Sequence, residues 1–335
     1  MRRRPGSLFC KLPHCHDMPI IDGYESSLVL VTIIDRYIIK IVQLSTDIFP
    51  FEPFMTDDAH AVHGSLAPTP FVAGLISTAQ RCPHNWFGKQ LALALRKIVL
   101  LTNEQPLDAA VGAIRLRCYL HDNVSERKFL FMPWLYDQQE RDLIARELPG
   151  DGVFVDIGAN VGIYTLWACQ SLTSRGTVIA IEPNPRVYDR LIFNLQANRS
   201  QNPDWPQVRT LPIAIGDKEA QLELHLDRTN LGGGSLISHP GSAGSITVSS
   251  RTLMSVLSEC GVARIDILKI DIEGAEDLAL LPFLRSASEQ LLPRYLITEN
   301  SEHLWRSDLV SAIKQRGYAV AFRTRMNTVY YQAGA

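Results

Sequence analysis

Residues 153–165 read VFVDIGANVGIYT, and this stretch predicts the fold around it. Its first three residues form a short apolar run, which is typical of a buried strand. The run closes at Asp156, glycines follow at Gly158 and Gly162, and apolar residues then recur at helical spacing. The stretch therefore predicts a strand, a tight glycine turn and a helix.

Such a turn suits a ligand site, because ligands of open parallel sheets bind beyond the carboxyl ends of the strands. A dinucleotide fingerprint starting at Gly158 would need glycine at Asn160 and Ile163, and neither is glycine. The pattern D-x-G-x-N-x-G resembles the first motif of S-adenosylmethionine-dependent methyltransferases. That resemblance implies that Asp156 faces the methionine amino group, and that the turn of Gly158, Asn160 and Gly162 faces its backbone. The alternative is a turn that only packs the helix on the strand.

Composition describes an ordinary globular protein. Of 335 residues, 46% are hydrophobic and 20% are charged. The net charge of -2 argues against a broad phosphate-binding surface, so we expect no nucleic-acid partner. Six scattered cysteines are typical of a reduced, cytoplasmic protein. No apolar run reaches the ~20 residues of a transmembrane helix.

The chain divides into three predicted segments. Residues 1–83 are expected to be an N-terminal extension, poorly defined or partly disordered. Residues 84–149 form an accessory segment with a helix near 91–101 and a strand near 113–120, and Pro149-Gly150-Asp151-Gly152 then marks the start of a catalytic domain, 150–335. Cys10, His14, Cys15 and His16 lie close together, but no second ligand pair follows, so no metal site is predicted.

Strands and helices alternate after the glycine turn, which predicts an α/β fold with a parallel sheet and helices on both faces. Seven strands are expected, and an antiparallel final pair would make this the Rossmann-like class I methyltransferase fold. Residues 220–249 predict a hairpin or flap. The strands expected are 153–155, 177–181, 208–215, 265–270, 295–298, 319–323 and 328–331.

Acidic residues recur where these strands end. They are Asp156, Glu182, Asp217, Asp271 and Glu299. Because parallel strands end at one edge of a sheet, these side chains are expected to converge on one crevice. For any single one, the alternative is a helix cap or a solvated loop residue. Glu182 is placed to bind ribose hydroxyls, and Asp217 lies where the adenine edge is expected, although its backbone could matter more than its side chain.

Four motifs together resemble the FkbM-type methyltransferase family. They are VFVDIGANVG, IEPNP, AIGD and LKIDIEGAE, the last covering residues 268–276, and the likeness runs from about residue 85 to 331. The resemblance implies S-adenosylmethionine as methyl donor and O-methylation of a small molecule or glycan, such as a sugar, glycolipid or polyketide. The chain departs from the family at Thr252-Leu253-Met254, where the family has T-L-D.

Methyl transfer from a sulfonium is an in-line displacement, in which alignment contributes up to about 7–11 kcal/mol and a general base about 10²–10⁴-fold. Asp271 is the first candidate for the base, followed by Glu273 and Glu299. Lys269 is expected to pair with a nearby acid, because a lysine in a central strand is rarely buried unpaired. A second hypothesis is that Asp271, Glu299 and Asn300 hold Mg²⁺, which oxygen ligands suit.

Two other functions stay open from the sequence. One is a catalytically silent methyltransferase fold that acts as a binding module. The other is a dinucleotide-dependent oxidoreductase, which would share the acid of the second strand but not the glycine spacing. A nucleic-acid methyltransferase is disfavoured, because the Asn/Asp-Pro-Pro-Tyr and Pro-Cys motifs are absent. The sequence does not predict an oligomeric state.

Overall fold

The computed structural model describes residues 62–227, 230–235 and 242–333. The cysteine and histidine group at 10–16 and most of the predicted N-terminal extension lie outside these residues. Helix α1, Pro70–Gln80, belongs to the part of that extension that is described. No described helix has the length and apolar character needed to cross a bilayer.

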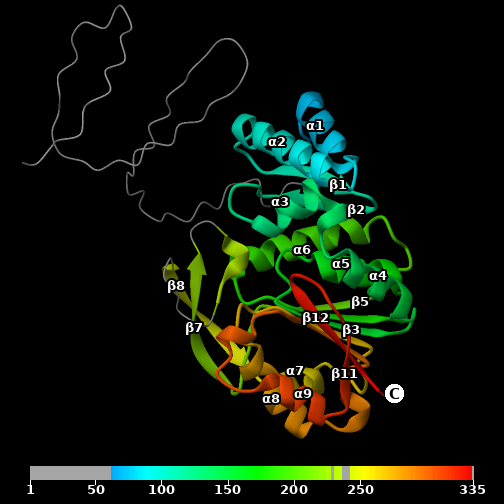
Figure 1. Ribbon diagram of the computed structural model, residues 1–335, viewed down its shortest axis with the longest axis vertical. Coiled ribbons are helices and arrows are strands. Elements are labelled where there is room, and N and C mark those ends of the chain that lie inside the picture. The colour runs from blue at the N-terminus through cyan, green and yellow to red at the C-terminus, as the bar shows by residue number, and fades with distance from the viewer. Residues whose placement is uncertain (1–61, 228–229, 236–241, 334–335) are drawn as a thin grey trace, which may run out of the picture. The chain divides into compact units, whose positions relative to one another are not determined.

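A seven-stranded sheet forms the centre of the molecule, in the order β11-β12-β10-β9-β3-β4-β5 (Figure 1). All neighbouring pairs are parallel except those of β12, which runs antiparallel to both β10 and β11. The predicted class I methyltransferase fold is therefore confirmed. The strands are β3 Val153–Ile157, β4 Thr177–Ile181, β5 Gln207–Leu211, β9 Ile267–Ile270, β10 Tyr295–Glu299, β11 Tyr318–Arg323 and β12 Asn327–Gln332.

Helices cover both faces of this sheet, because each central strand is apolar on both sides. On β3, Phe154 packs into the core beneath α4, α5 and α6, whereas Val155 packs into the core beneath α7, α8 and α9. Figure 1 shows these two helical layers above and below the strands. The helices are α4 Gln138–Glu147, α5 Ile163–Ser171, α6 Pro185–Arg199, α7 Leu253–Glu259, α8 Glu276–Ser286 and α9 Leu309–Gln315.

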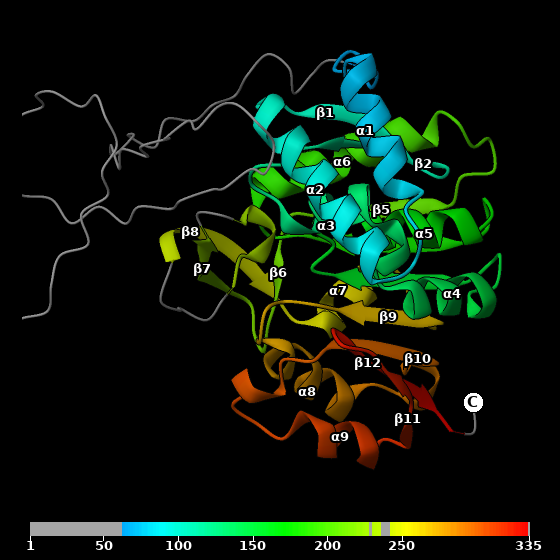
Figure 2. The same cartoon turned by 45° about the horizontal axis from the view of Figure 1, so that its top comes forward.

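Residues 62–131 add an outer layer over α5 and α6 (Figure 2). Its elements are α1, α2 Trp86–Thr102, β1 Leu107–Val111, β2 Ile114–Cys118 and α3 Val124–Phe131, and β1 and β2 form an antiparallel hairpin. The hairpin is fixed to α6 by side-chain amides. The Arg117 amide donates to Oδ1 of Asn194, and the Arg115 amide donates to Oδ1 of Asn198, both at 2.9 Å.

A separate three-stranded sheet of order β6-β8-β7 contains the predicted flap. Its strands are β6 Ala214–Ile215, β7 Ala220–Asp227 and β8 Ser242–Arg251. The single strand predicted for 208–215 is wrong, because β5 ends at Leu211 and Pro212 follows. Proline has no N–H for a sheet ladder, and after it the chain leaves the main sheet to pair with β8.

Short 3₁₀ turns complete the described chain at Pro133–Leu135, Leu231–Gly233, Glu289–Leu291 and Glu302–Leu304. Thr252, the first residue of the T-L-M departure, caps α7 by accepting the Ser255 amide at 3.2 Å. Met254 packs half-buried against the core beneath α7 and α8.

Candidate active site

The turn between β3 and α5 needs glycine at two positions. Gly158 has a φ of +74°, and a Cβ there would lie 1.9 Å from the backbone oxygen of Asp271. Gly162 has a φ of +92°, and its Cβ would lie 2.6 Å from Cδ1 of Leu191. The Gly158 amide also donates to the Ile181 carbonyl oxygen at 2.9 Å. The main chain of this turn therefore packs directly against the carboxyl ends of strands β4 and β9.

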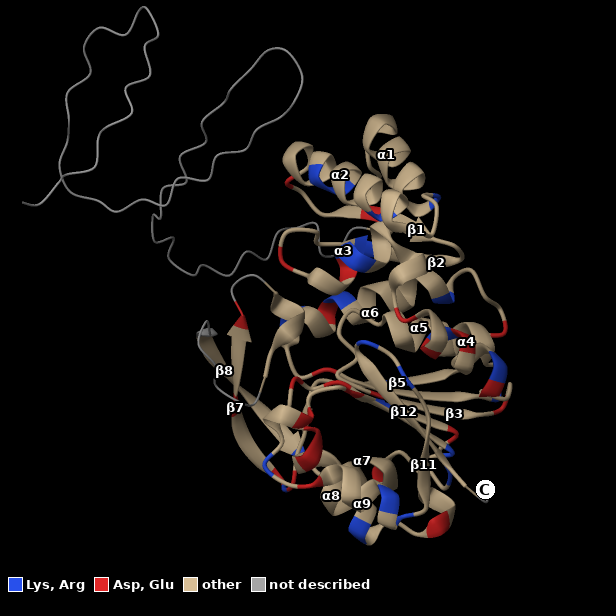
Figure 3. Ribbon diagram, in the orientation of Figure 1, with Lys and Arg blue, Asp and Glu red and all other residues tan. Residues whose placement is uncertain are grey.

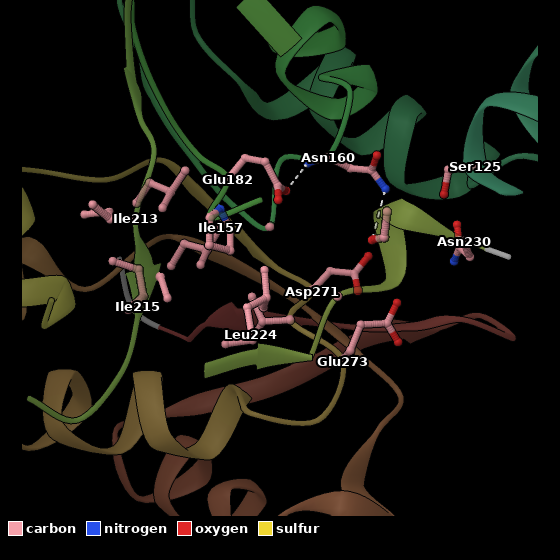
Figure 4. Close-up of a pocket in the computed structure, with 17 residues that line it drawn as sticks. Ser125, Ile157, Asn160, Glu182, Ile213, Ile215, Leu224, Asn230, Asp271 and Glu273 are labelled. Atoms are coloured by element: carbon pink, nitrogen blue, oxygen red, sulfur yellow. Dashed lines mark hydrogen bonds between the residues drawn. The ribbon is translucent and has the colours of Figure 1, made fainter. Parts of the chain in front are cut away.

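Glu182 follows β4 and is held by the glycine turn. Its Oε2 accepts the Asn160 amide at 2.9 Å (Figure 4). Its Oε1 accepts the Asn184 amide, also at 2.9 Å. Asn160 supplies its amide from a left-handed conformation, with a φ of +51°. Burial raises the pKa of Glu182 to about 7, although the hydrogen bonds from the two backbone amides act in the opposite direction. Glu182, which follows β4, is thus held in place by the turn that follows β3.

Lys269 connects two predicted site residues beneath the turn. Its Nζ donates to the Gly158 carbonyl oxygen at 2.9 Å, and lies 3.5 Å from both Oδ1 of Asp156 and Oδ2 of Asp271. Burial lowers the pKa of Lys269, but the two carboxylates outweigh it and the pKa is raised overall. The expected pairing of this lysine with a nearby acid is confirmed.

Asp156 lies behind the site rather than in it. It is fully buried, lines no described cavity, and accepts the Thr165 hydroxyl at 2.6 Å. Side chains alternate along a strand, so Asp156 shares the α5 side with Phe154. Burial raises the pKa of Asp156, and Lys269 opposes that shift. The structure thus places this carboxylate beneath the turn and outside the cavity wall, linked to Asp271 through Lys269.

The three predicted catalytic acids, Asp271, Glu273 and Glu299, form an acidic pole at the ends of β9 and β10. Burial raises the pKa of Glu273 to about 7 and that of Glu299 to about 9, and the charge of Asp271 adds to both shifts. Since each of these groups influences the next, the structure brings the three carboxyl groups into one neighbourhood.

Glu276 braces the loop that carries Asp271 and Glu273. Its Oε1 accepts the amides of Ile272 and Gly274, at 3.0 and 3.3 Å. Its Oε2 accepts from the Ser301 hydroxyl and the Trp305 indole, each at 2.7 Å. The loop after β9 is thereby tied to the segment after β10, which fixes the acidic pole.

A cavity of about 690 Å³, including space open to solvent, lies at this edge of the sheet. One end is polar and the other is apolar. In the view of Figure 4, Glu182 and Asn160 lie above the cavity, and Asp271 and Glu273 lie below it. The apolar end is lined by Ile213, Ile215 and Leu224.

A second hollow of about 300 Å³ adjoins this cavity. The two share Ser125, Gly158, Asn160 and Asp271 in their walls, and the second hollow adds Tyr136 and Lys269. Gly158, predicted to be the point of close ligand approach, therefore stands between two connected spaces.

Not every predicted residue reaches the cavity. Asp217 is exposed and does not line it, although Ile213, Ala214 and Ile215 just before it do. In this segment the structure therefore places apolar side chains, and not that of Asp217, at the cavity. Gly162 and Glu299 also lie outside the cavity wall, although Glu299 belongs to the acidic pole.

Residues from two distant segments complete the wall and were missed by the sequence analysis. Ser125 of α3 and Asn230 and Gly232 of the flap line the cavity. Asn160 joins them: its Oδ1 accepts from Asn123 Nδ2 at 2.9 Å, and its Nδ2 donates to the Gly232 oxygen at 3.4 Å. The Gly232-Gly233-Gly234 run in the sequence indicated that another segment could approach the backbone closely. No local pattern indicated that this segment is the turn that carries Asn160.

The Mg²⁺ hypothesis gains no further ligand from the described residues. No group of three His, Cys, Asp or Glu side chains there is arranged to hold a metal ion. Asn300, the other oxygen donor considered, accepts the Thr328 hydroxyl at 2.7 Å and donates to the Thr324 oxygen at 3.1 Å. Its side chain serves the turn between β11 and β12.

Three curated relatives match at low identity. AMB antimetabolite synthetase AmbE of Pseudomonas aeruginosa is 25% identical over 244 residues, covering 60% of this chain and 11% of that protein. Methyltransferase sdnD of Sordaria araneosa is 25% identical over 205 residues, covering 52% and 76%. Hexuronic acid methyltransferase AglP of Haloferax volcanii is 26% identical over 135 residues, covering 40% and 51%. The chain thus spans a small part of the first relative and about half of the third.

Among solved structures, the methyltransferase FkbM of Methylobacillus flagellatus aligns with a TM-score of 0.37 at 16% identity, covering 63% of this chain and 55% of that one. The model of the methyltransferase FkbM domain matches residues 156–318, which run from the end of β3 to the start of β11. This match includes the glycine turn, Glu182 and the acidic pole. Residues 156–318 of this chain are therefore a methyltransferase domain of the FkbM family.

Proposed function

We propose that this domain transfers a methyl group from S-adenosylmethionine to a hydroxyl of a small molecule or glycan. The observation that carries the proposal is the charge of the cavity. Carboxyl groups of Glu182, Asp271 and Glu273 line its polar end, and Lys269, which lines the adjoining hollow, is already paired. Such an end favours a ligand with positive charge and hydroxyl donors.

The residues present fit this donor along its length. Glu182 has lone pairs left to accept hydrogen bonds from ribose hydroxyls. Ile213, Ile215 and Leu224 form an apolar surface against which the adenine ring could pack. Gly158 and Asn160 line the cavity, so the main chain of the turn lies at its wall, where the methionine part of the donor would bind. When bound, S-adenosylmethionine supplies an electrophilic methyl group on a sulfonium.

The acidic pole would then act on the acceptor. Glu273, with a pKa raised to about 7, can take a proton near neutral pH, which suits a general base. Glu299, with a pKa raised to about 9, keeps its proton near neutral pH. Within the acidic pole it would therefore act as a hydrogen-bond donor to a neighbouring carboxylate. Asp271 lines both hollows and is held by its ion pair with Lys269, so it would orient the acceptor.

The charge of the cavity disfavours the oxidoreductase alternative. A dinucleotide carries a diphosphate, which needs N–H or cationic partners. Carboxyl groups line the polar end instead. The relative named as a hexuronic acid methyltransferase supports a glycan acceptor, as a similarity over 40% of this chain.

Calorimetry with S-adenosylmethionine and S-adenosylhomocysteine tests donor binding. We expect Glu182→Gln to weaken binding at least tenfold, since a neutral amide holds two hydroxyls less well. Asp217→Asn is the matched control, because Asp217 is exposed and outside the cavity. Unchanged binding in Glu182→Gln would contradict the assignment.

A screen with methyl-labelled donor against sugars, glycolipids and polyketides, with and without Mg²⁺, tests the reaction. Transfer to a hydroxyl that is lost in Glu273→Gln is the expected result. Donor binding without turnover on any acceptor would instead favour a silent binding module.

A further inference from the structure

Helix α2 carries an apolar face that no other described element covers. Phe87 is 76% exposed and Leu101 is 71% exposed, and Leu91 and Ile98 between them are exposed as well. These four residues recur at helical spacing, so they lie on one side of the helix. We call them the α2 apolar face; Trp86 at the start of α2 and Phe71 at the start of α1 are exposed near it.

Helix α2 is nevertheless packed against the rest of the protein on another side. Gly88, Ala92 and Val99 form a different side of α2 and are buried. The fit there is close, because a Cβ on Gly88 would lie 1.9 Å from the Pro83 oxygen. The α2 apolar face is thus additional to the packed face, and a contiguous exposed apolar surface marks an interaction site.

The charged residues of α2 and of the loop between α1 and α2 are all basic, and the next acid along the chain is Glu104, after the end of α2. No Asp or Glu occurs from residue 59 to 103, whereas Arg81, Lys89, Arg96 and Lys97 fall in that range. Within the described residues, none of these four forms an ion pair. Figure 3 shows α2 with blue residues and no red ones. Since the chain as a whole has a net charge of -2, this basic surface is local.

We propose that α1 and α2 dock on the surface of an anionic lipid bilayer. The α2 apolar face and Trp86 would enter the headgroup region, and Lys97, which flanks the face on the helix, would contact lipid phosphates. Exposed Trp, Phe and Leu beside Lys and Arg are the combination found in helices that lie in a membrane interface. A second copy of this chain is the weaker choice, because it would bring the same uncompensated positive charge to the contact.

Co-sedimentation of the full chain with lipid vesicles tests this docking. We expect binding to vesicles of phosphatidylglycerol and phosphatidylcholine, weaker binding at high salt, and little binding to phosphatidylcholine alone. Phe87→Asp and Leu101→Asp should each reduce binding at least tenfold. Val320→Asp is the matched control: Val320 is half-exposed on the edge strand β11, away from α1 and α2. Circular dichroism confirms that each variant is folded.

Three results would overturn the proposal. The first is no binding of the full chain to the anionic vesicles, as expected if another segment of the chain covered the face. The second is equal binding of Phe87→Asp and the unchanged protein. The third is a dimer in light scattering that Phe87→Asp converts to a monomer, which would make a second copy the occupant.

Discussion

Gly158 lies where the carboxyl ends of β3, β4 and β9 meet: it follows β3, donates to Ile181 of β4 and contacts Asp271 after β9. Its φ of +74° and the missing Cβ allow the Asp271 oxygen to sit where a side chain would be. Gly261 is a matched control, because it has a φ of +68° with no atom within 4 Å of its Cβ position. Only the backbone conformation is strained at Gly261, whereas Gly158 also faces a clash.

We therefore predict different costs for two alanine substitutions. Gly261→Ala should lower the free energy of unfolding by about 1–2 kcal/mol, the cost of a left-handed non-glycine residue. Gly158→Ala should cost about 1–3 kcal/mol more, the usual range for overpacking, and should weaken donor binding. Urea denaturation measures both, and equal costs would contradict the close approach at Gly158.

Lys269 leads to a second prediction at this scale. Lys269→Met should lower the free energy of unfolding by about 3–5 kcal/mol, because it leaves the buried Asp156 carboxylate without a counter-charge. Arg264→Met removes an exposed cation whose pairs with Asp151 and Asp266 lie at 3.6 and 3.9 Å. That variant should cost at most about 1 kcal/mol. Similar values for the two would mean that Asp156 has another partner.

The loop after β9 and the end of β10 act together as an element, because Glu276 ties them and their carboxyl groups interact. Burial and neighbouring acids raise the pKa of Glu299 to about 9 from a usual 4.5. The folded state therefore holds the Glu299 proton more tightly than the unfolded chain does. Its contribution to stability is full below pH 4.5 and is lost as the pH rises towards 9.

Glu299→Gln should remove this part of the pH dependence. Between pH 6 and 9, the free energy of unfolding should fall less in the variant than in the unchanged protein, by up to roughly 1.4 kcal/mol per pH unit for one proton. Urea denaturation across this range measures the slope. Glu104→Gln, at an exposed position, should keep the original slope. A slope that Glu299→Gln leaves intact would place the titration elsewhere.

At the scale of the molecule, the N-terminal layer and the family domain share one core. Buried side chains from α1 to β12 belong to the same apolar cluster, and the Phe129 and Trp167 rings lie 5.8 Å apart across the junction. Ser125 of this layer also lines the cavity. Residues 62–149 therefore complete both the fold and the site.

Separate production of residues 150–335 tests this dependence. Without the outer layer, the apolar surfaces of α5 and α6 would face water, so we expect this fragment to be insoluble or to unfold without a cooperative transition. Residues 62–335 should unfold cooperatively in thermal melts followed by circular dichroism. A cooperative melt of 150–335 alone would instead support the domain boundary predicted at residue 150.

The sequence by itself determined the alternating elements, the glycine turn and the acids that close β3, β4, β9 and β10. These features are encoded locally, because apolar periodicity and turn residues act within a few positions. The tertiary structure decided what these residues do. Asp156 was expected to face a ligand, and strand alternation directs its side chain to the α5 side, behind the cavity wall.

Long-range contacts explain the remaining differences. Lys269 donates to Gly158 across 111 positions of sequence, and Asn160 meets Gly232 across 72. The apolar wall from Ile213 to Ile215 depends on the strand after Pro212, which pairs with β8 about 35 positions further along the chain. Such pairings depend on the free energy of the whole packed molecule, so no local pattern in the sequence could reveal them.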